Sequence, residues 1–211
     1  MEIITGRTLE RYIDQNPNDL TVDQFQFIIE DIFADENKGT IHDETFDFFQ
    51  WQYGLSGRQE IFCKYILDNY YQKYGGKEVL EVGCGRTAKL SKLLSYDFRM
   101  TAIDPKLAIK GLLNFAHIKG FFDENMPIDR FDLIIGLEPC EATEHIVRAC
   151  VKARKEFVVV LCGVPHDAIN GKTFDDVHDW YEYLVSIDRD FLKLDRLNMN
   201  GFNPYIIKNK S

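Results

Sequence analysis

Residues 79–87 read Val-Leu-Glu-Val-Gly-Cys-Gly-Arg-Thr, a short apolar run that ends in two closely spaced glycines and leads into a helical pattern. A glycine-bearing turn between a buried strand and a helix lets a ligand approach the bare backbone. The N-terminus of the following helix favours polar or anionic ligand groups. This stretch therefore predicts a strand, turn and helix that together bind a nucleotide-like cofactor.

The residues of this turn match the sequence patterns of two classes of cofactor-binding protein. Residues 83–88, Gly-Cys-Gly-Arg-Thr-Ala, satisfy the dinucleotide fingerprint with alanine in the third glycine position, and Asp104 lies about twenty residues on, where a ribose-binding acid is expected. This pattern alone indicates a nicotinamide or flavin enzyme. In the second pattern, Glu81 precedes Gly83 and Gly85, and a further strand over 99–104 delivers the Asp104 carboxylate to the ribose hydroxyls.

In the second pattern the chain resembles the class I S-adenosylmethionine-dependent methyltransferases, from about Gly57 to the C-terminus. The matching stretches are Glu81–Gly85, Ile103-Asp104, Phe131–Gly136 and the last two strands. The resemblance implies a Rossmann-like α/β sheet of about seven strands that ends in an antiparallel hairpin. It also implies two parts, an N-terminal helical cap over residues 1–56 and a catalytic domain over residues 57–211.

Alternating patterns from Lys77 onward support this fold, because alternating strands and helices call for a mostly parallel sheet covered on both faces. We expect strands at 78–83, 99–104, 117–122, 131–137 and 157–162, and helices near 87–96, 106–115, 141–154 and 174–187. Residues 191–197 and 204–207 flank Asn200-Gly201, a strong hairpin signal. A terminal antiparallel hairpin is the methyltransferase arrangement, whereas simple dinucleotide domains usually continue with parallel crossovers.

Ligands of open α/β sheets bind beyond the carboxyl ends of the strands. In the family, the glycine turn passes the methionine part of the cofactor, the acid after the second strand holds the ribose, and residues after the third strand meet the adenine. The resemblance and the strand ends together place S-adenosyl-L-methionine against Glu81, Gly83, Cys84, Gly85, Asp104, Pro105, Asp123, Glu124 and Leu137. The family's third glycine falls on Thr87, which we expect to cap the following helix instead.

Glu138 and His166 are the candidate catalytic residues. Glu138 follows the fourth strand, where the family places residues near the methyl group, and a general base is needed if the nucleophile carries a poorly acidic proton. A plain interaction with the dipole of the next helix is the alternative role for Glu138. His166, in the loop after the fifth strand, is a candidate base or substrate-orienting residue, or an ordinary loop histidine.

Cysteine usage indicates reduced thiols, because five cysteines with irregular spacing and no Cys-x-x-Cys fit neither a disulfide framework nor structural zinc. We therefore expect no metal. Cys140 and Cys162 follow neighbouring predicted strands, so their thiols lie near the transferred methyl group or act as small buried hydrophobic groups.

The N-terminal part contains the aromatic cluster Phe46, Phe48, Phe49, Trp51 and Tyr53. Its side chains either pack the helical cap against the sheet or form a lid that excludes water from a substrate pocket.

Composition describes an ordinary domain, with 211 residues of which 45% are hydrophobic. The chain shows no bilayer-spanning stretch and no secretory signal at its start, so we expect a cytoplasmic protein that does not bind membranes. A net charge of −9 opposes non-specific binding to nucleic acid. The sequence therefore favours methyl transfer to an O, N or S nucleophile of a small molecule. An RNA methyltransferase, an NAD-dependent oxidoreductase and a non-catalytic S-adenosylmethionine-binding protein remain as alternatives.

Overall fold

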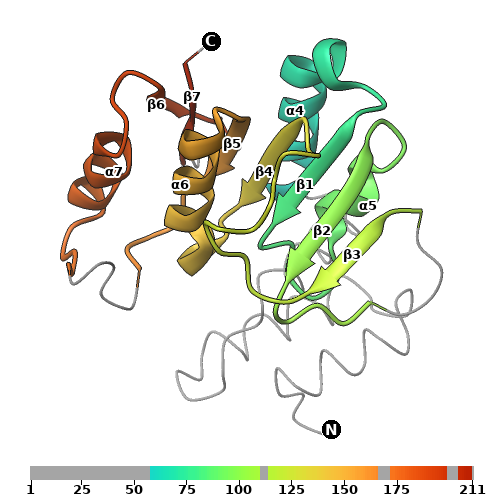
Figure 1. Ribbon diagram of the computed structural model, residues 1–211, viewed down its shortest axis with the longest axis horizontal. Coiled ribbons are helices and arrows are strands. Elements are labelled where there is room, and N and C mark those ends of the chain that lie inside the picture. The colour runs from blue at the N-terminus through green and yellow to red at the C-terminus, as the bar shows by residue number, and fades with distance from the viewer. Residues whose placement is uncertain (1–57, 110–113, 166–171, 199–203, 211) are drawn as a thin grey trace, which may run out of the picture. The chain divides into compact units, whose positions relative to one another are not determined.

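The computed structural model describes residues 58–109, 114–165, 172–198 and 204–210 (Figure 1). The described helices are α4 (Arg58–Tyr74), α5 (Lys89–Leu94), α6 (Thr143–Ala153) and α7 (Val177–Ser186), with a short 3-10 helix η1 (Cys140–Ala142). The described strands are β1 (Glu78–Val82), β2 (Arg99–Asp104), β3 (Ala116–Lys119), β4 (Leu133–Leu137), β5 (Glu156–Val160), β6 (Leu192–Arg196) and β7 (Tyr205–Asn209). The predicted helical cap, its aromatic cluster, His166 and the Asn200-Gly201 turn lie outside the described residues.

The strands form one sheet in the order β3-β2-β1-β4-β5-β7-β6. Neighbours from β3 to β5 pair in parallel, whereas β7 is antiparallel to both β5 and β6. A simple dinucleotide-binding sheet has strand order 3-2-1-4-5-6. Here the terminal hairpin inserts β7 between β5 and β6, which confirms the predicted Rossmann-like sheet with its antiparallel end.

Alternate residues of the central strands supply two cores, one on each face of the sheet. In β1, Val79 faces the core beneath α4 and α5, while Leu80 faces the core beneath α6 and α7. In β5, Val158 belongs to the core beneath α4 and α5, and Phe157 belongs to the core beneath α6 and α7. Figure 1 shows α4 and α5 on one side of the sheet and α6 on the other. Burial on both faces explains why these strands are continuous apolar runs in the sequence.

The predicted helix cap at Thr87 is wrong. Helix α5 begins at Lys89, and the residue before it, Ala88, is in the left-handed conformation (φ 47°, ψ 50°) with no side-chain cap. The Ala88 side chain is fully buried. The turn therefore continues past Thr87, which is exposed, to bring Ala88 into the core.

A second correction concerns the helix expected over 106–115. Its described residues, 106–109 and 114–115, are not helical. The N–H of Ala108 donates to the carbonyl of Arg86 at 2.9 Å. This bond ties the segment after β2 to the glycine turn. Strand β3 also stops at Lys119, short of the expected end, and the chain continues so that Phe122 enters the core.

No helix in the described ranges combines the length and the apolar character that crossing a bilayer requires.

Candidate functional site

Most of the predicted site residues gather at one edge of the sheet. Strands β1 to β5 run parallel, so their carboxyl ends, at Val82, Asp104, Lys119, Leu137 and Val160, point the same way. The residues that follow these ends line the predicted ligand edge. Pro105 lies exposed in the turn after β2, and Leu137 is the half-buried last residue of β4.

The glycine turn is fastened to the end of β2 through its own N–H groups. Those of Gly83 and Cys84 donate to the carbonyl of Ile103 at 2.9 and 3.4 Å. That of Gly85 donates to Oδ2 of Asp104 at 2.9 Å. Three consecutive backbone donors at the centre of the fingerprint are therefore used within the protein.

Asp104 holds this turn and keeps capacity for a ligand. Its Oδ2 accepts from Gly85, and its Oδ1 accepts from the backbone N–H of Lys106 at 2.7 Å. An ionised carboxylate offers about four lone-pair positions, and these two bonds use two of them. The side chain is partly exposed. Asp104 can thus accept from two ribose hydroxyls while it organises the loop.

Position 83 must be glycine because the neighbouring loop leaves no room for a side chain. Its φ is +72°, and a Cβ added there would lie 2.6 Å from Cβ and 2.8 Å from Cα of Pro139. No side chain fits into that space. The turn after β1 therefore packs directly on the loop after β4, which brings the predicted cofactor residues next to Glu138.

Glu81 lies beneath the turn. Its side chain is in the middle of β1 and only 2% exposed, and it accepts a hydrogen bond from the Ser91 hydroxyl of α5. This contact links the strand to the helix on the other side of the glycine turn. The cofactor contact predicted for Glu81 remains a prediction.

Glu138 has a partner, Arg58, that could not be found from the sequence. Nη1 of Arg58, the first residue of α4, donates to both carboxylate oxygens of Glu138 at 2.8 and 2.6 Å. The two side chains are 27% and 17% exposed. Because Arg58 and Glu138 are eighty positions apart, no local pattern connects them. Glu138 is thus a positioned, partly buried carboxylate at the ligand edge.

The first turn of α4 lies close to this edge. Arg58 reaches Glu138 after β4, and Glu60 forms an ion pair at 2.8 Å with Lys89, the first residue of α5. Gln59, between them, is 9% exposed, and within the described ranges no donor reaches its Oε1. A buried amide oxygen without a partner costs free energy unless a ligand or water satisfies it. Gln59 is therefore a site candidate that the sequence did not reveal.

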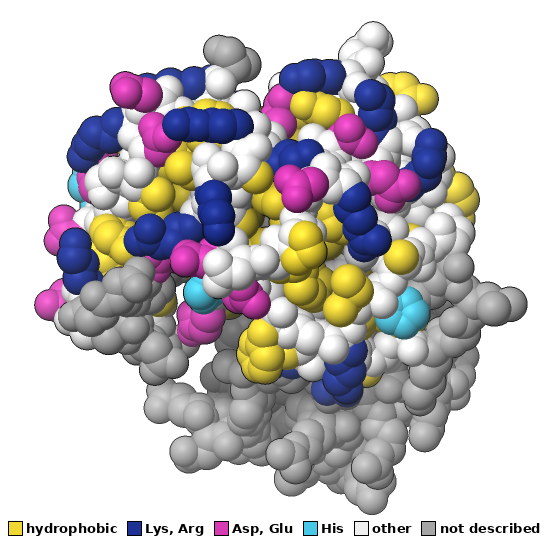
Figure 2. All heavy atoms as spheres, viewed as in Figure 1, with side chains coloured by type: hydrophobic (Ala, Val, Ile, Leu, Met, Phe, Trp, Pro, Cys, Tyr) yellow, Lys and Arg dark blue, Asp and Glu magenta, His cyan; other side chains and the backbone are white. Residues whose placement is uncertain are grey.

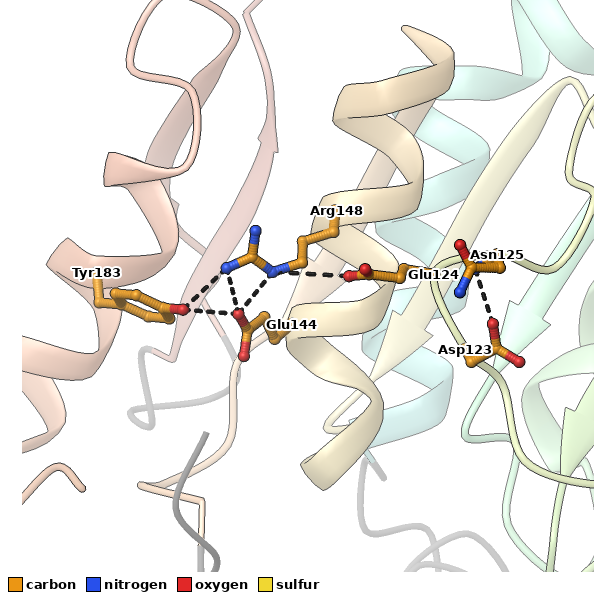
Figure 3. Close-up of polar contacts among 6 residues, drawn as sticks. All are labelled: Asp123, Glu124, Asn125, Glu144, Arg148 and Tyr183. Carbon is orange, nitrogen blue, oxygen red and sulfur yellow. Dashed lines mark hydrogen bonds and ion pairs between the residues drawn. The ribbon is translucent and has the colours of Figure 1, made fainter. Parts of the chain in front are cut away.

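The residues expected to meet the adenine follow β3. Oδ1 of Asp123 accepts from the N–H of Asn125 at 2.7 Å, which shapes the loop as a turn. Glu124 points toward Arg148 of α6, with Oε2 3.7 Å from Nε (Figure 3). The loop is thereby held against α6.

Arg148 belongs to a network that joins α6 to α7. Its guanidinium donates to Oε1 of Glu144, which is 4% exposed, and to the hydroxyl of Tyr183 (Figure 3). The Tyr183 hydroxyl also donates to Glu144 Oε1 at 2.7 Å. The pKa of Arg148 is raised: partial burial acts against the charged form, but the hydrogen bonds to Glu144 and Tyr183 outweigh it.

Replacing Arg148 with methionine should lower the free energy of unfolding by about 2 kcal/mol, because the buried Glu144 carboxylate loses its cationic partner. Tyr183→Phe removes a single hydroxyl from the network and should cost about 1 kcal/mol. Urea unfolding monitored by circular dichroism measures both. Equal losses for the two variants would contradict a charge-dominated network.

The exposed charges are mixed in sign. On the face drawn in Figure 2, lysine and arginine side chains are interspersed with carboxylates.

Within the described residues, no group of three or more histidine, cysteine or acidic side chains is arranged to hold a metal ion.

Comparisons with known proteins found no matching family model and no matching curated protein. Solved structures that match include an rRNA methylase from Streptococcus thermophilus, 12% identical over 72% of this chain and 94% of that chain, with a TM-score of 0.46. Magnesium protoporphyrin IX methyltransferase from Synechocystis PCC 6803 is also 12% identical, over 99% of this chain and 97% of that chain, with a TM-score of 0.49. The N-methyltransferase NodS from Bradyrhizobium japonicum WM9 is 13% identical over 70% of this chain and 93% of that chain, with a TM-score of 0.47.

At such low identity these similarities concern the fold alone, and the fold rests on the sheet itself. Strand order β3-β2-β1-β4-β5-β7-β6 with an antiparallel β7 is the arrangement expected for class I methyltransferases. The described part of this chain has the Rossmann-like fold of the class I S-adenosylmethionine-dependent methyltransferases.

Proposed function

We propose that this chain binds S-adenosylmethionine at the carboxyl edge of its sheet and transfers the methyl group to an O, N or S nucleophile of a small molecule. The observation that carries the proposal is that the backbone N–H groups of the glycine turn are already hydrogen-bonded within the protein. The N–H groups of Gly83, Cys84 and Gly85 all bond to the end of β2.

This arrangement disfavours a dinucleotide. A pyrophosphate is held by backbone N–H groups of the glycine turn and by the helix N-terminus. Here the central donors are used, the Asp104 carboxylate lies beside the turn, and the helix that follows has only six residues. The same surroundings suit S-adenosylmethionine, which carries a cationic sulfonium and an ammonium group. The NAD-dependent alternative is therefore not retained.

The residues present fit this cofactor at two points. Asp104 has lone pairs left for the two ribose hydroxyls. The buried Gln59 Oε1, in the first turn of α4, is an acceptor of the kind that an ammonium group needs, and the next residue, Glu60, pairs with Lys89 at the start of α5. Glu81, Cys84, Pro105, Leu137, Asp123 and Glu124 complete the proposed surroundings of the cofactor.

Bound S-adenosylmethionine supplies a methyl group activated by the neighbouring positive sulfur. The protein then acts mainly by placing the nucleophile in line with that group, since effective concentration can supply much of the rate. Glu138 is the proposed general base for an acceptor whose nucleophile carries a proton. Arg58 positions Glu138 by holding both of its oxygens. His166 stays a second candidate from the sequence.

Calorimetry on the full chain with S-adenosylmethionine, S-adenosylhomocysteine and NAD tests the cofactor. We expect both sulfur compounds to bind and NAD to show no measurable heat. NAD binding without binding of either sulfur compound would overturn the proposal.

The acceptor class requires a separate experiment. The protein and labelled S-adenosylmethionine are incubated with cell extract that has been divided into metabolite, RNA and protein fractions. We expect label in the metabolite fraction. Label confined to RNA would replace the small-molecule proposal with the RNA alternative. Cofactor binding without transfer to any fraction would indicate a non-catalytic binding protein.

With the acceptor in hand, Glu138→Gln should lower kcat by about 100-fold, the usual contribution of a general base, because the amide cannot take up the proton. Its affinity for S-adenosylmethionine should remain within about threefold, a difference of less than 1 kcal/mol. Glu141→Gln is the matched control, since Glu141 is exposed in η1, three residues after Glu138. An unchanged kcat in Glu138→Gln would show that transfer needs no base at this position.

A further inference from the structure

Two thiols lie at the ligand edge. Cys140 follows β4 and Cys162 follows β5, and these strands are parallel neighbours with Leu137 opposite Val160. The N–H of Glu138 extends this pairing by donating to the carbonyl of Val160 at 3.0 Å. Cys140 and Cys162 therefore come together just beyond the end of the ladder.

The two cysteines are in direct contact. The Cys162 thiol hydrogen bonds to Cys140. This contact, together with the smaller effect of burial, raises the pKa of Cys162. Cys162 is half-buried, whereas Cys140 is exposed to solvent. The pair thus combines an accessible thiol with a more buried thiol within reach of it.

The other three cysteines differ from this pair. Cys63, Cys84 and Cys150 are buried. Burial, with smaller contributions from Asp97 and Glu60, raises the pKa of Cys63 to about 11. Burial also raises the pKa of Cys150. Because Cys140 is exposed and these three cysteines are buried, an oxidant in solution should react with Cys140 first.

The loop that carries Cys140 is held in an unusual backbone conformation. Glu138 and Cys140, on either side of Pro139, both have positive φ, 51° and 48°. Such conformations are costly for residues with side chains. Pro139 itself packs against Gly83 of the glycine turn. A covalent change at Cys140 is therefore transmitted directly to the turn that we assign to the cofactor.

We propose that Cys140 and Cys162 are a redox-active pair that a peroxide converts to an intramolecular disulfide. The deprotonated Cys140 sulfur attacks one peroxide oxygen, the O–O bond breaks, and after protonation of the leaving oxygen the products are a sulfenic acid and water. The Cys162 sulfur then attacks the Cys140 sulfur. The S–S bond forms, the S–O bond breaks, and the hydroxide leaves with the Cys162 proton as a second water. The two thiols lose two electrons, and one peroxide is reduced to two waters. A dithiol reductant restores both thiols by exchange.

The disulfide should also weaken cofactor binding, by about tenfold, equivalent to about 1.4 kcal/mol. The reason is that drawing Cys140 toward Cys162 moves Pro139 on Gly83. This coupling rests on the proposed function, whereas formation of the disulfide does not.

Peptide mapping tests the pair. The reduced full chain is treated with hydrogen peroxide, the remaining thiols are blocked, and the digest is examined by mass spectrometry. We expect one cross-linked species, Cys140 to Cys162, that disappears after treatment with a dithiol. Cys162→Ser should accumulate a sulfenic acid at Cys140 that dimedone traps, and Cys140→Ser should form no intramolecular disulfide. Cys84→Ser, the matched control, should still form the cross-link.

A different cross-link, or oxidation of the buried cysteines before Cys140, would overturn the proposal. The order of iodoacetamide labelling in the unaltered chain gives a measurement that needs no variant, with Cys140 expected first. Calorimetry with S-adenosylmethionine on the reduced and oxidised chain then tests the coupling. Absence of binding in the reduced chain would refute the proposed function, while equal affinity in the two forms would refute only the coupling.

Discussion

Replacing Asp104 with alanine should weaken S-adenosylmethionine binding by about 1,000-fold, or about 4 kcal/mol, as measured by calorimetry. Two effects add. The variant loses the carboxylate acceptors proposed for both ribose hydroxyls. It also releases the N–H groups of Gly85 and Lys106, which the carboxylate holds at 2.9 and 2.7 Å, so the glycine turn loses one of its three bonds to the end of β2.

Asp176→Ala is the matched control for this variant. Asp176 also accepts from two backbone N–H groups, those of His178 and Asp179, but it does so at the start of α7. Its loss should cost about 1 kcal/mol of stability as the loss of a helix cap and leave cofactor affinity unchanged. If Asp104→Ala bound the cofactor as tightly as Asp176→Ala does, the ribose assignment would be wrong.

The Gly83→Ala variant should lose about 3 to 4 kcal/mol of folding free energy, from about 1 to 2 for the left-handed backbone and the rest from overpacking. The new methyl group would lie 2.6 Å from the Pro139 Cβ and 2.8 Å from its Cα. Because one of those contacts is with backbone, rotation of a side chain cannot relieve the overlap. Guanidinium unfolding measures the loss.

Gly76→Ala separates the two contributions. Gly76 has the same φ of +72°, but a Cβ there would meet nothing within 4 Å. It should therefore cost only the backbone term, about 1 to 2 kcal/mol. Similar losses for Gly83→Ala and Gly76→Ala would show that the loop after β4 moves aside, and that the packing of Pro139 on the turn does not constrain this site.

Much of the fold follows from local patterns in the sequence. The apolar runs that became β1, β2, β4 and β5 could be located to within two residues, because strands buried on both faces need continuous apolar side chains. The terminal hairpin was also correctly predicted as antiparallel. Errors arose at boundaries. The helix cap was assigned to Thr87 and a helix to 106–115, since a local pattern does not show tertiary contacts such as the burial of Ala88 or the bond from Ala108 to Arg86.

The chemistry of the site was less predictable. The glycine turn by itself matched both a dinucleotide and S-adenosylmethionine, and the sequence favoured the second only through Glu81, Asp104 and the terminal hairpin. The structure adds a local argument for S-adenosylmethionine, because the N–H groups of Gly83 and Cys84 bond to the carbonyl of Ile103, about twenty positions away. A fingerprint records which residues form a turn and does not record where their N–H groups point.

The sequence by itself determined the sheet, its carboxyl edge and the carboxylate at the end of β2, because hydrophobic period and turn residues are local properties. Tertiary structure alone paired Arg58 with Glu138 and placed Pro139 on Gly83. The physical reason is that these contacts connect segments that only the folded sheet brings together. Hydrogen-bond partners and steric fit depend on three-dimensional distance, which separation along the chain does not reveal.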